Sequence, residues 1–313
     1  ARCSLAHCCC VHHYNVMTHP TKELFLQWYQ QAARAPLDWL LTAFEESKKY
    51  AQYTLLSSFI ARSISGHLGS EGDGAQALVW ADRAMALLDD KNTLKKAYGG
   101  DEDYLASVHA CVVLKVRWLS LSDEHMHWYK AKDLAENMLA TGFPSIYLKG
   151  SSSKDGIALA LMLMGVYNRL GEHAKAMDLG TRVQSQAQVQ GDAATECRAS
   201  FNWAVATLLL AKYYTVENKS VDAQAALDSA CHVLNTLQAN PEMRALLGVF
   251  VDAVAAYGTW LQVSSPADAQ AFAQQWNVET QWGLLDIVQM HSSARDEALA
   301  DVFVRNLEEA SGA

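Results

Sequence analysis

Proline is scarce in this chain. Only Pro20, Pro36, Pro144, Pro241 and Pro266 interrupt its 313 residues. Proline ends or kinks helices because it lacks an amide hydrogen and clashes with the preceding turn, so long proline-free stretches favour helices. Alanine, leucine, glutamine, methionine and glutamate, which lose little entropy in a helix, recur through these stretches. Alternating β-branched runs bounded by hairpin turns do not occur. The sequence therefore predicts an all-α fold.

Apolar residues recur with a helical period, and the breaks between them divide the chain into helical hairpins. The expected helices cover residues 21–33, 37–64 (one long helix or two abutting ones), 75–88, 104–121, 124–140, 157–170, 173–190, 193–214, 221–237, 242–263, 266–290 and 294–307. The glycine-rich segment 66–74 is expected to be a loop. A lone hairpin cannot bury its apolar stripe unless a neighbour packs on it. We therefore expect a superhelical array of antiparallel helical hairpins, an α-solenoid.

Three parts follow from this pattern. Residues 1–19 lack helical periodicity and are expected to form a poorly ordered tail, residues 20–150 to form the first hairpins, and residues 151–313 to form more regular hairpins with a C-terminal capping helix. The tail concentrates cysteine and histidine, but a zinc site needs a second ligand pair downstream, which is missing. We expect no metal there.

Segment 157–190 carries a recognisable set of residues. Five of them have the types and offsets of a tetratricopeptide repeat (TPR): Leu163, Tyr167, Leu170, Gly171 and Ala176. Gly171 frees the turn, Ala176 allows close helix contact, and Met164 stands where the family usually has a small residue. This segment therefore resembles a TPR, and the rest of the chain matches less well. The resemblance implies a TPR-like α-solenoid that presents a helical groove to a peptide or a partner subunit.

The net charge of −9 is unevenly distributed. Residues 1–214 carry 21 acidic and 21 basic side chains, whereas residues 215–313 carry 13 acidic and 4 basic ones. An acidic surface repels phosphate backbones and attracts basic proteins. The expected partners are therefore proteins with a basic surface, and nucleic acid is not expected.

The search for catalytic motifs is negative. The segment Gly150–Gly156 lacks the Gly-Lys-Ser/Thr ending of a phosphate-binding loop. His125 and His127 are two residues apart, which places them on different faces of a helix, so they cannot hold a metal together. We expect no catalytic residues, no metal and no cofactor, and hence no enzyme.

Residues 242–310 are the expected docking surface. Tryptophan is enriched in interface hot spots, and an acid on an apolar helix must face solvent, a groove or a basic partner. The candidate partner-binding residues are Asp252, Trp260, Phe272, Trp276, Trp282 and Asp286. For any one of the aromatic residues, core packing is the competing interpretation.

The sequence thus favours a non-catalytic protein-binding scaffold or adaptor, a subunit of a multiprotein assembly. Helical-repeat RNA binding and an all-helical enzyme are the alternatives. The odd cysteine count without framework spacing indicates a reducing compartment, cytoplasm or nucleus, or an organelle matrix if a presequence is removed. Charged residues break every apolar run, so we expect no membrane insertion.

Overall fold

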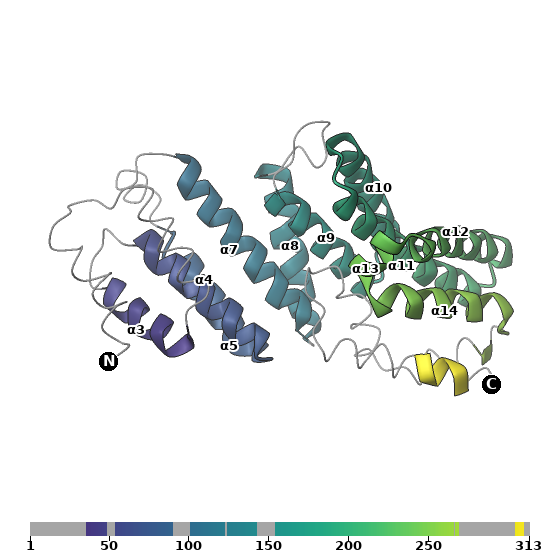
Figure 1. The fold of residues 1–313 in the computed structure, drawn as a ribbon, viewed down its shortest axis with the longest axis horizontal. Helices are drawn as coiled ribbons and strands as arrows, with labels where there is room; N and C mark the ends of the chain where they lie inside the picture. Colours follow the sequence, from purple (N-terminus) through teal and green to yellow (C-terminus); the bar gives the residue numbers. More distant parts are fainter. Residues whose placement is uncertain are drawn as a thin grey trace. The chain divides into compact units, whose positions relative to one another are not determined.

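The computed structural model describes residues 36–48, 54–89, 101–122, 124–142, 154–265, 267–268 and 304–309. Every regular element in these ranges is a helix, so the all-α prediction is confirmed for them. The main helices are α3 (Leu37–Ser47), α4 (Thr54–Ser70), α5 (Gly74–Ala86), α7 (Asp101–Leu121), α8 (His125–Thr141), α9 (Lys154–Arg169), α10 (His173–Gln190), α11 (Ala193–Val216), α12 (Ser220–Ala239), α13 (Pro241–Leu247) and α14 (Val249–Val263) (Figure 1). They belong to two compact units, residues 1–122 and 123–313. The expected N-terminal tail, with its cysteines and histidines, lies outside the described residues.

In the unit of residues 1–122, serine hydroxyls of α4 bond to the backbone of α5. Ser58 donates a hydrogen bond to the carbonyl oxygen of Ala84 at 2.8 Å, and Ser65 donates one to the carbonyl oxygen of Ala77 at 2.6 Å. All four residues are fully buried. The two bonds show that α4 and α5 run antiparallel. They also require the two backbones to lie close together, which only small side chains at these positions permit.

Helix α7 packs on α4 in the same register. The indole nitrogen Nε1 of Trp118 donates to Oγ of Ser65 at 2.8 Å, and Sγ of Cys111 lies 3.6 Å from Oγ of Ser58. In each pair the α7 residue lies 53 positions after its α4 partner, so α7 runs parallel to α4 over this stretch. The Ser65 hydroxyl accepts from α7 and donates to α5. It therefore links three helices.

The end of α4 differs from the sequence prediction. The loop expected over residues 66–74 is wrong for residues 66–70 and for Gly74, because α4 continues to Ser70 and α5 begins at Gly74. Gly69 lies against the six-membered ring of Trp118, and a Cβ atom at Gly69 would overlap that ring. Gly69 therefore lies within a helix, and a glycine is needed there to leave room for Trp118 of α7 and not to form a turn. The turn itself is confined to residues 71–73, where Gly72 has a φ of +90°.

In the unit of residues 123–313, helices α9 to α12 form two consecutive antiparallel hairpins. Gly191, in the turn between α10 and α11, has a φ of +68°, which glycine adopts without strain. Gln184 bonds to Ser200 at 2.8 Å, and Gln188, one turn later, bonds to Glu196 at 2.7 Å. These bonds join α10 of the first hairpin to α11 of the second. Each hairpin therefore packs on its neighbour.

Three of the positions that resemble a TPR, Leu163, Tyr167 and Ala176, lie in the core of this unit, whereas Gly171 lies in the exposed turn. Leu163 and Ala176 are fully buried, and Gly171 has the positive φ, +74°, that the turn requires. Met164, large where the family is usually small, faces Gly180 on α10. A Cβ atom at Gly180 would lie 2.6 Å from the Met164 methyl group. A large side chain on α9 is thus matched by an absent one on α10.

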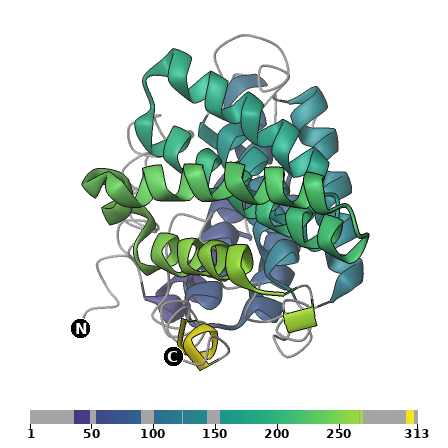
Figure 2. The same cartoon turned by 90° about the vertical axis from the view of Figure 1, so that its right-hand side faces the viewer.

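Helix α14 packs antiparallel on α12, and the two lie alongside each other in Figure 2. Gln238 donates to Asp252 at 2.7 Å, and Gln262 donates to Asp228 at 3.2 Å, so the two helices run antiparallel. The single helix expected over residues 242–263 is wrong, because the chain bends by 99° at Gly248. Leu307, in the short helix 304–309, lies in the same core. The rest of the expected capping helix lies outside the described residues.

Within the part of the chain that the structure describes, one helix could cross a membrane by length and composition alone, although the sequence led us to expect none. This helix is Tyr104–Leu121 within α7, and the bent pair α13–α14 would be a second candidate if it counted as one span. Cys111, Val112, Val116 and Trp118 of α7 are buried inside the protein. Core helices commonly have this composition, so the finding is weak evidence for a membrane span.

Candidate partner-binding site

The backbone bends sharply between α12 and α14. Asn240 caps α13 by accepting hydrogen bonds from the amides of Glu242 and Met243 at 3.0 and 3.3 Å, and Pro241 occupies the first helical position. Gly248 then ends α13 with φ +61° and ψ −149°, a conformation that is essentially restricted to glycine. We call the segment Gln238–Asp252 the elbow.

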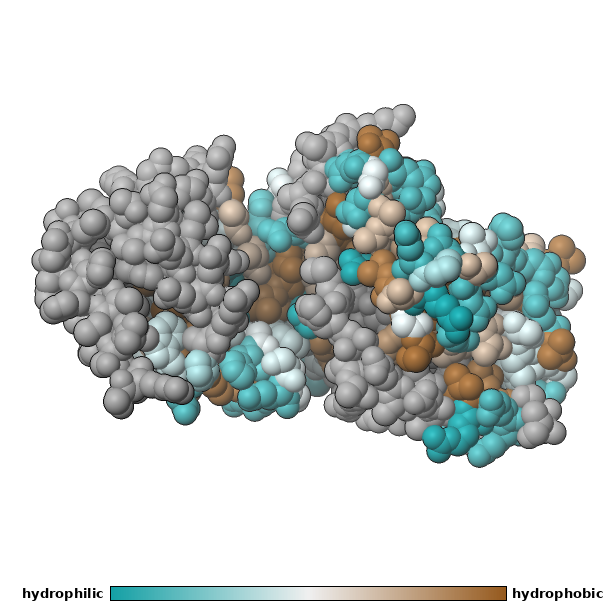
Figure 3. All heavy atoms as spheres, viewed as in Figure 1, coloured by the Kyte–Doolittle hydropathy of each residue, from teal (hydrophilic) through white to brown (hydrophobic). Residues whose placement is uncertain are grey.

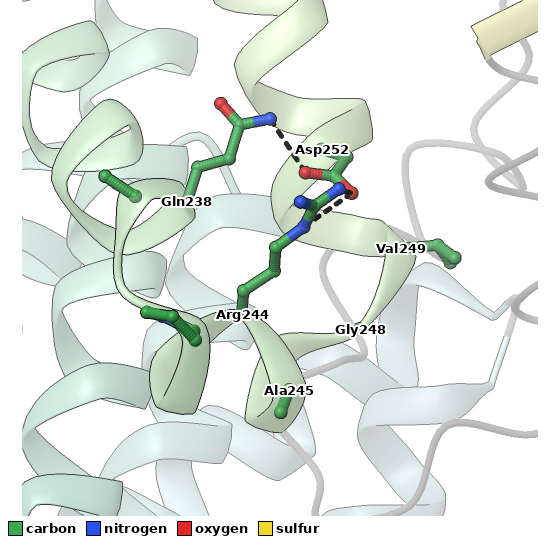
Figure 4. A pocket seen from close by; sticks show the side chains of 8 residues that line it. Gln238, Arg244, Ala245, Gly248, Val249 and Asp252 are labelled. Atoms are coloured by element: carbon green, nitrogen blue, oxygen red, sulfur yellow. Dashed lines mark hydrogen bonds and ion pairs between the residues drawn. The ribbon is translucent and has the colours of Figure 1, made fainter.

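An ion pair spans the elbow. Nη2 and Nε of Arg244, on α13, lie 2.8 and 3.2 Å from Oδ2 of Asp252, on α14. The other carboxylate oxygen, Oδ1, accepts a hydrogen bond from Gln238 on α12. Asp252 therefore connects three consecutive helices, as Figure 4 shows. Its charge is neutralised within the chain.

A depression of about 560 Å³ lies at the elbow and is open to solvent. Its lining is mostly apolar and consists of Gln238, Ala239, Pro241, Arg244, Ala245, Gly248, Val249 and Asp252. Val249 is 40 % exposed, and the adjacent Leu246 is 38 % exposed. On the face seen in Figure 3, apolar and polar residues alternate in small groups over this unit. The elbow thus combines exposed apolar side chains with a structured ion pair.

The six residues singled out from the sequence have different positions. Asp252 lines the depression, whereas Trp260 is only 8 % exposed and belongs to the core, where its ring stacks on Tyr257 at a centroid distance of 6.1 Å. Burial raises the pKa of Tyr257 to about 12. The remaining four, Phe272, Trp276, Trp282 and Asp286, lie outside the described residues. Among the described ranges, only Asp252 of the six contributes to the elbow surface.

Sequence reasoning missed Gln238, Arg244, Gly248 and Val249. Arg244 and Asp252 are eight residues apart, and in a straight helix such residues are separated by about 12 Å along the axis. Only the bend at Gly248 brings their side chains together. No helical spacing rule could therefore have paired them, although a glycine within an apolar helical pattern is a weak signal of a break.

A second polar cluster joins α8 to the α9–α10 turn. Glu172 pairs with Lys132 at 2.5 Å and with Lys175 at 2.7 Å, and Tyr167 donates a hydrogen bond to Glu136 at 2.8 Å. Burial alone would raise the pKa of Glu172, but the hydrogen bonds from the two lysines outweigh it and hold that pKa below its ordinary value. The hydrogen bond to Glu172 raises the pKa of Lys132. The charge of Glu172 is thus paired within the chain, and the cluster joins α8 to the α9–α10 turn.

Two basic groups nearby are partly withdrawn from water. Burial, with a smaller contribution from the charge of Lys212, lowers the pKa of His173 to about 4, so its imidazole is neutral at pH 7. The ring nitrogen Nδ1 lies 3.3 Å from Oδ1 of Asn168. Burial also lowers the pKa of Lys212. The hydrogen-bonded, mostly buried imidazole is placed as a packing group.

Within the described ranges, no three or more histidine, cysteine, aspartate or glutamate residues are grouped so that they could hold a metal ion. The cysteines there, Cys111, Cys197 and Cys231, are buried free thiols. Burial raises the pKa of all three, that of Cys197 to about 11, so the reactive thiolate is disfavoured.

No protein-family model matches this sequence, and no curated protein matches it either.

Proposed function

We propose that this chain is a non-catalytic scaffold that binds other proteins, with α9–α14 packed as a TPR-like array and the elbow as a contact surface. It would act as a subunit of a larger assembly. The binding mechanism would be shape complementarity and apolar contact, with the acidic surface directing the approach of the partner.

One observation carries the proposal: the elbow depression is open, mostly apolar and structured by its own ion pair. A pocket for a small substrate normally encloses most of its ligand. An open depression lined by exposed apolar residues such as Ala245 and Val249 suits a side chain that projects from another polypeptide.

The chemistry of the elbow also favours binding over catalysis. Among the described residues that line it, Asp252 is the one acid and Arg244 the one base, and the two form an ion pair with each other. A general acid or base needs a proton-transferring group that is available to a substrate. The thiols of Cys111, Cys197 and Cys231 are poor nucleophiles for a different reason, because burial raises their pKa values and favours the protonated form.

Site-specific photo-crosslinking tests the proposal. A benzophenone amino acid is introduced at Ala245, which lines the depression, and in a matched variant at Ala225, an exposed alanine of α12 outside it. Both variants are irradiated with ultraviolet light in cell extract, at low and at high salt, and the crosslinked proteins are identified by mass spectrometry. We expect a defined protein to be captured from position 245 and not from position 225.

Capture of the same proteins from both positions, or of none from either, would contradict the proposal. Retention of single-stranded RNA by the purified chain at low salt would favour the RNA-binding alternative instead.

A further inference from the structure

The ion pair at the elbow can be exchanged. The Arg244 side chain is 57 % exposed and that of Asp252 34 %. Ion pairs this exposed add little stability, because water solvates both partners when they separate. A guanidinium or ammonium group from another molecule could therefore replace Arg244 on Oδ2 of Asp252 at little net cost.

Helix α13 can yield to such an exchange. It has only seven residues, too few to be stable alone, and most of its side chains are exposed. Leu247, 2 % exposed, is its fully buried anchor. Hydrogen bonds between α12 and α14, one near each end of their contact, join those two helices without involving Arg244. Displacing Arg244 would thus leave the packing of α14 on α12 intact.

The charge of this part of the chain selects the incoming group. Residues 215–313 carry 13 acidic and 4 basic side chains, which attracts cations and repels anions. Among the described residues, Asp252 is the acidic group that lines the depression, and the apolar part of the same lining includes Ala245 and Val249. A basic side chain with an apolar neighbour complements both features.

We propose that the elbow binds a segment of a partner protein that carries an arginine or lysine beside an apolar residue. The basic side chain replaces Arg244 on Asp252, and the apolar one covers Ala245 and Val249. This inference rests on the proposed function, since it specifies the partner chemistry of the same surface. Arg244 is then an internal competitor that must leave before the partner binds.

Fluorescence anisotropy with two peptides tests the exchange on the full-length chain. One labelled twelve-residue peptide alternates leucine and arginine with glycine spacers, and the second has citrulline, the neutral analogue, in place of arginine. We expect binding of the arginine peptide alone, weakened by salt. The decisive variant is Arg244→Ala, which should tighten that binding about threefold, because it removes the competitor.

Matched variants separate this exchange from net charge. Lys219→Ala removes an equivalent exposed cation, paired with Glu217 at 3.3 Å, from outside the depression and should leave the affinity within about 1.5-fold. Asp252→Asn should weaken arginine-peptide binding about fivefold, and Asp222→Asn, at an exposed acid of α12, much less. Circular dichroism confirms that each variant is folded.

The inference is overturned if the citrulline peptide binds equally well, or if Arg244→Ala leaves the affinity for the arginine peptide unchanged or weakens it. It is also overturned if Lys219→Ala changes that affinity as much as Arg244→Ala does, and Asp222→Asn as much as Asp252→Asn does. These results would leave a protein captured from position 245 unexplained but real, so the scaffold proposal would stand. A failure to capture any protein would instead count against the scaffold proposal, whatever the peptides do.

Discussion

Replacing Ser65 by alanine removes the hydroxyl that links α4, α5 and α7. The substitution deletes two hydrogen bonds, one to the carbonyl oxygen of Ala77 and one from Nε1 of Trp118. Ser65 is fully buried and Trp118 nearly so, and water has little access to either partner. The indole N–H is then a buried donor without an acceptor.

The expected cost follows from these two losses. A lost hydrogen bond costs about 1 kcal/mol, and an unsatisfied buried donor costs about 1–3 kcal/mol, so Ser65→Ala should destabilise the 1–122 unit by about 3 kcal/mol. Ser58 provides the matched control. It is equally buried on the same helix and also bonds to a backbone carbonyl, but its α7 neighbour is Cys111, whose thiol is a weak donor. Ser58→Ala should therefore cost only about 1 kcal/mol.

Native-state hydrogen exchange followed by mass spectrometry resolves the two substitutions. Amides of α4, α5 and α7 that exchange through opening of this unit should exchange about a hundredfold faster in Ser65→Ala and about fivefold faster in Ser58→Ala. Combining Ser65→Ala with Trp118→Phe removes the orphaned donor, so the double variant should cost less than the sum of the single ones. Equal effects at Ser65 and Ser58, or additivity in the cycle, would refute the reasoning.

Three further predictions concern single positions. Gly248→Ala should lower the free energy of unfolding by about 1–3 kcal/mol, because alanine is strained in the backbone conformation of Gly248, whereas Gly66→Ala, within α4, should raise it by about 0.5–1 kcal/mol. A Cβ atom at either site meets no neighbour, so the two effects come from the backbone alone. Shifts of the thermal unfolding midpoint in the same direction for both variants would contradict this. His173 has a pKa below its unfolded value of 6.5, so its contribution is complete above pH 6.5 and lost as the pH falls toward 4; His173→Gln should remove that part of the pH dependence of unfolding. Glu172→Gln should lower the free energy of unfolding, measured by chemical denaturation, by about 2 kcal/mol, because Lys132 loses its carboxylate partner. An unchanged free energy of unfolding would show that the cluster does not contribute to stability.

Local patterns predicted the helices well wherever the deciding interactions are local. The starts and ends of α10 and α11 follow from apolar periodicity, glycine turns and the Asp192 cap, all of which act within a few residues. Gly69 shows the limit of such reasoning. Its role depends on Trp118, which lies on another helix, so its neighbours in the sequence suggested a loop where the protein has a helix.

The candidate site was predictable only in part. Asp252 could be recognised because a carboxylate within an apolar helix needs a polar environment or a partner. That partner could not be recognised, because the bend at Gly248 changes which residues are neighbours. Trp260 could not be assigned from the sequence. Tryptophan is common both in protein cores and at interfaces, and only the 8 % exposure of Trp260 in the structure shows that it belongs to the core.

The sequence by itself determined the helical class, most helix boundaries and the acidic character of the last hundred residues, because propensity, periodicity and charge are properties of the chain. The tertiary structure alone decided how Ser65 links three helices, how Met164 fits against Gly180 and how Arg244 meets Asp252. Each of these depends on distances between residues on different helices. Such distances are set by packing and by bends in the backbone, which no local pattern contains.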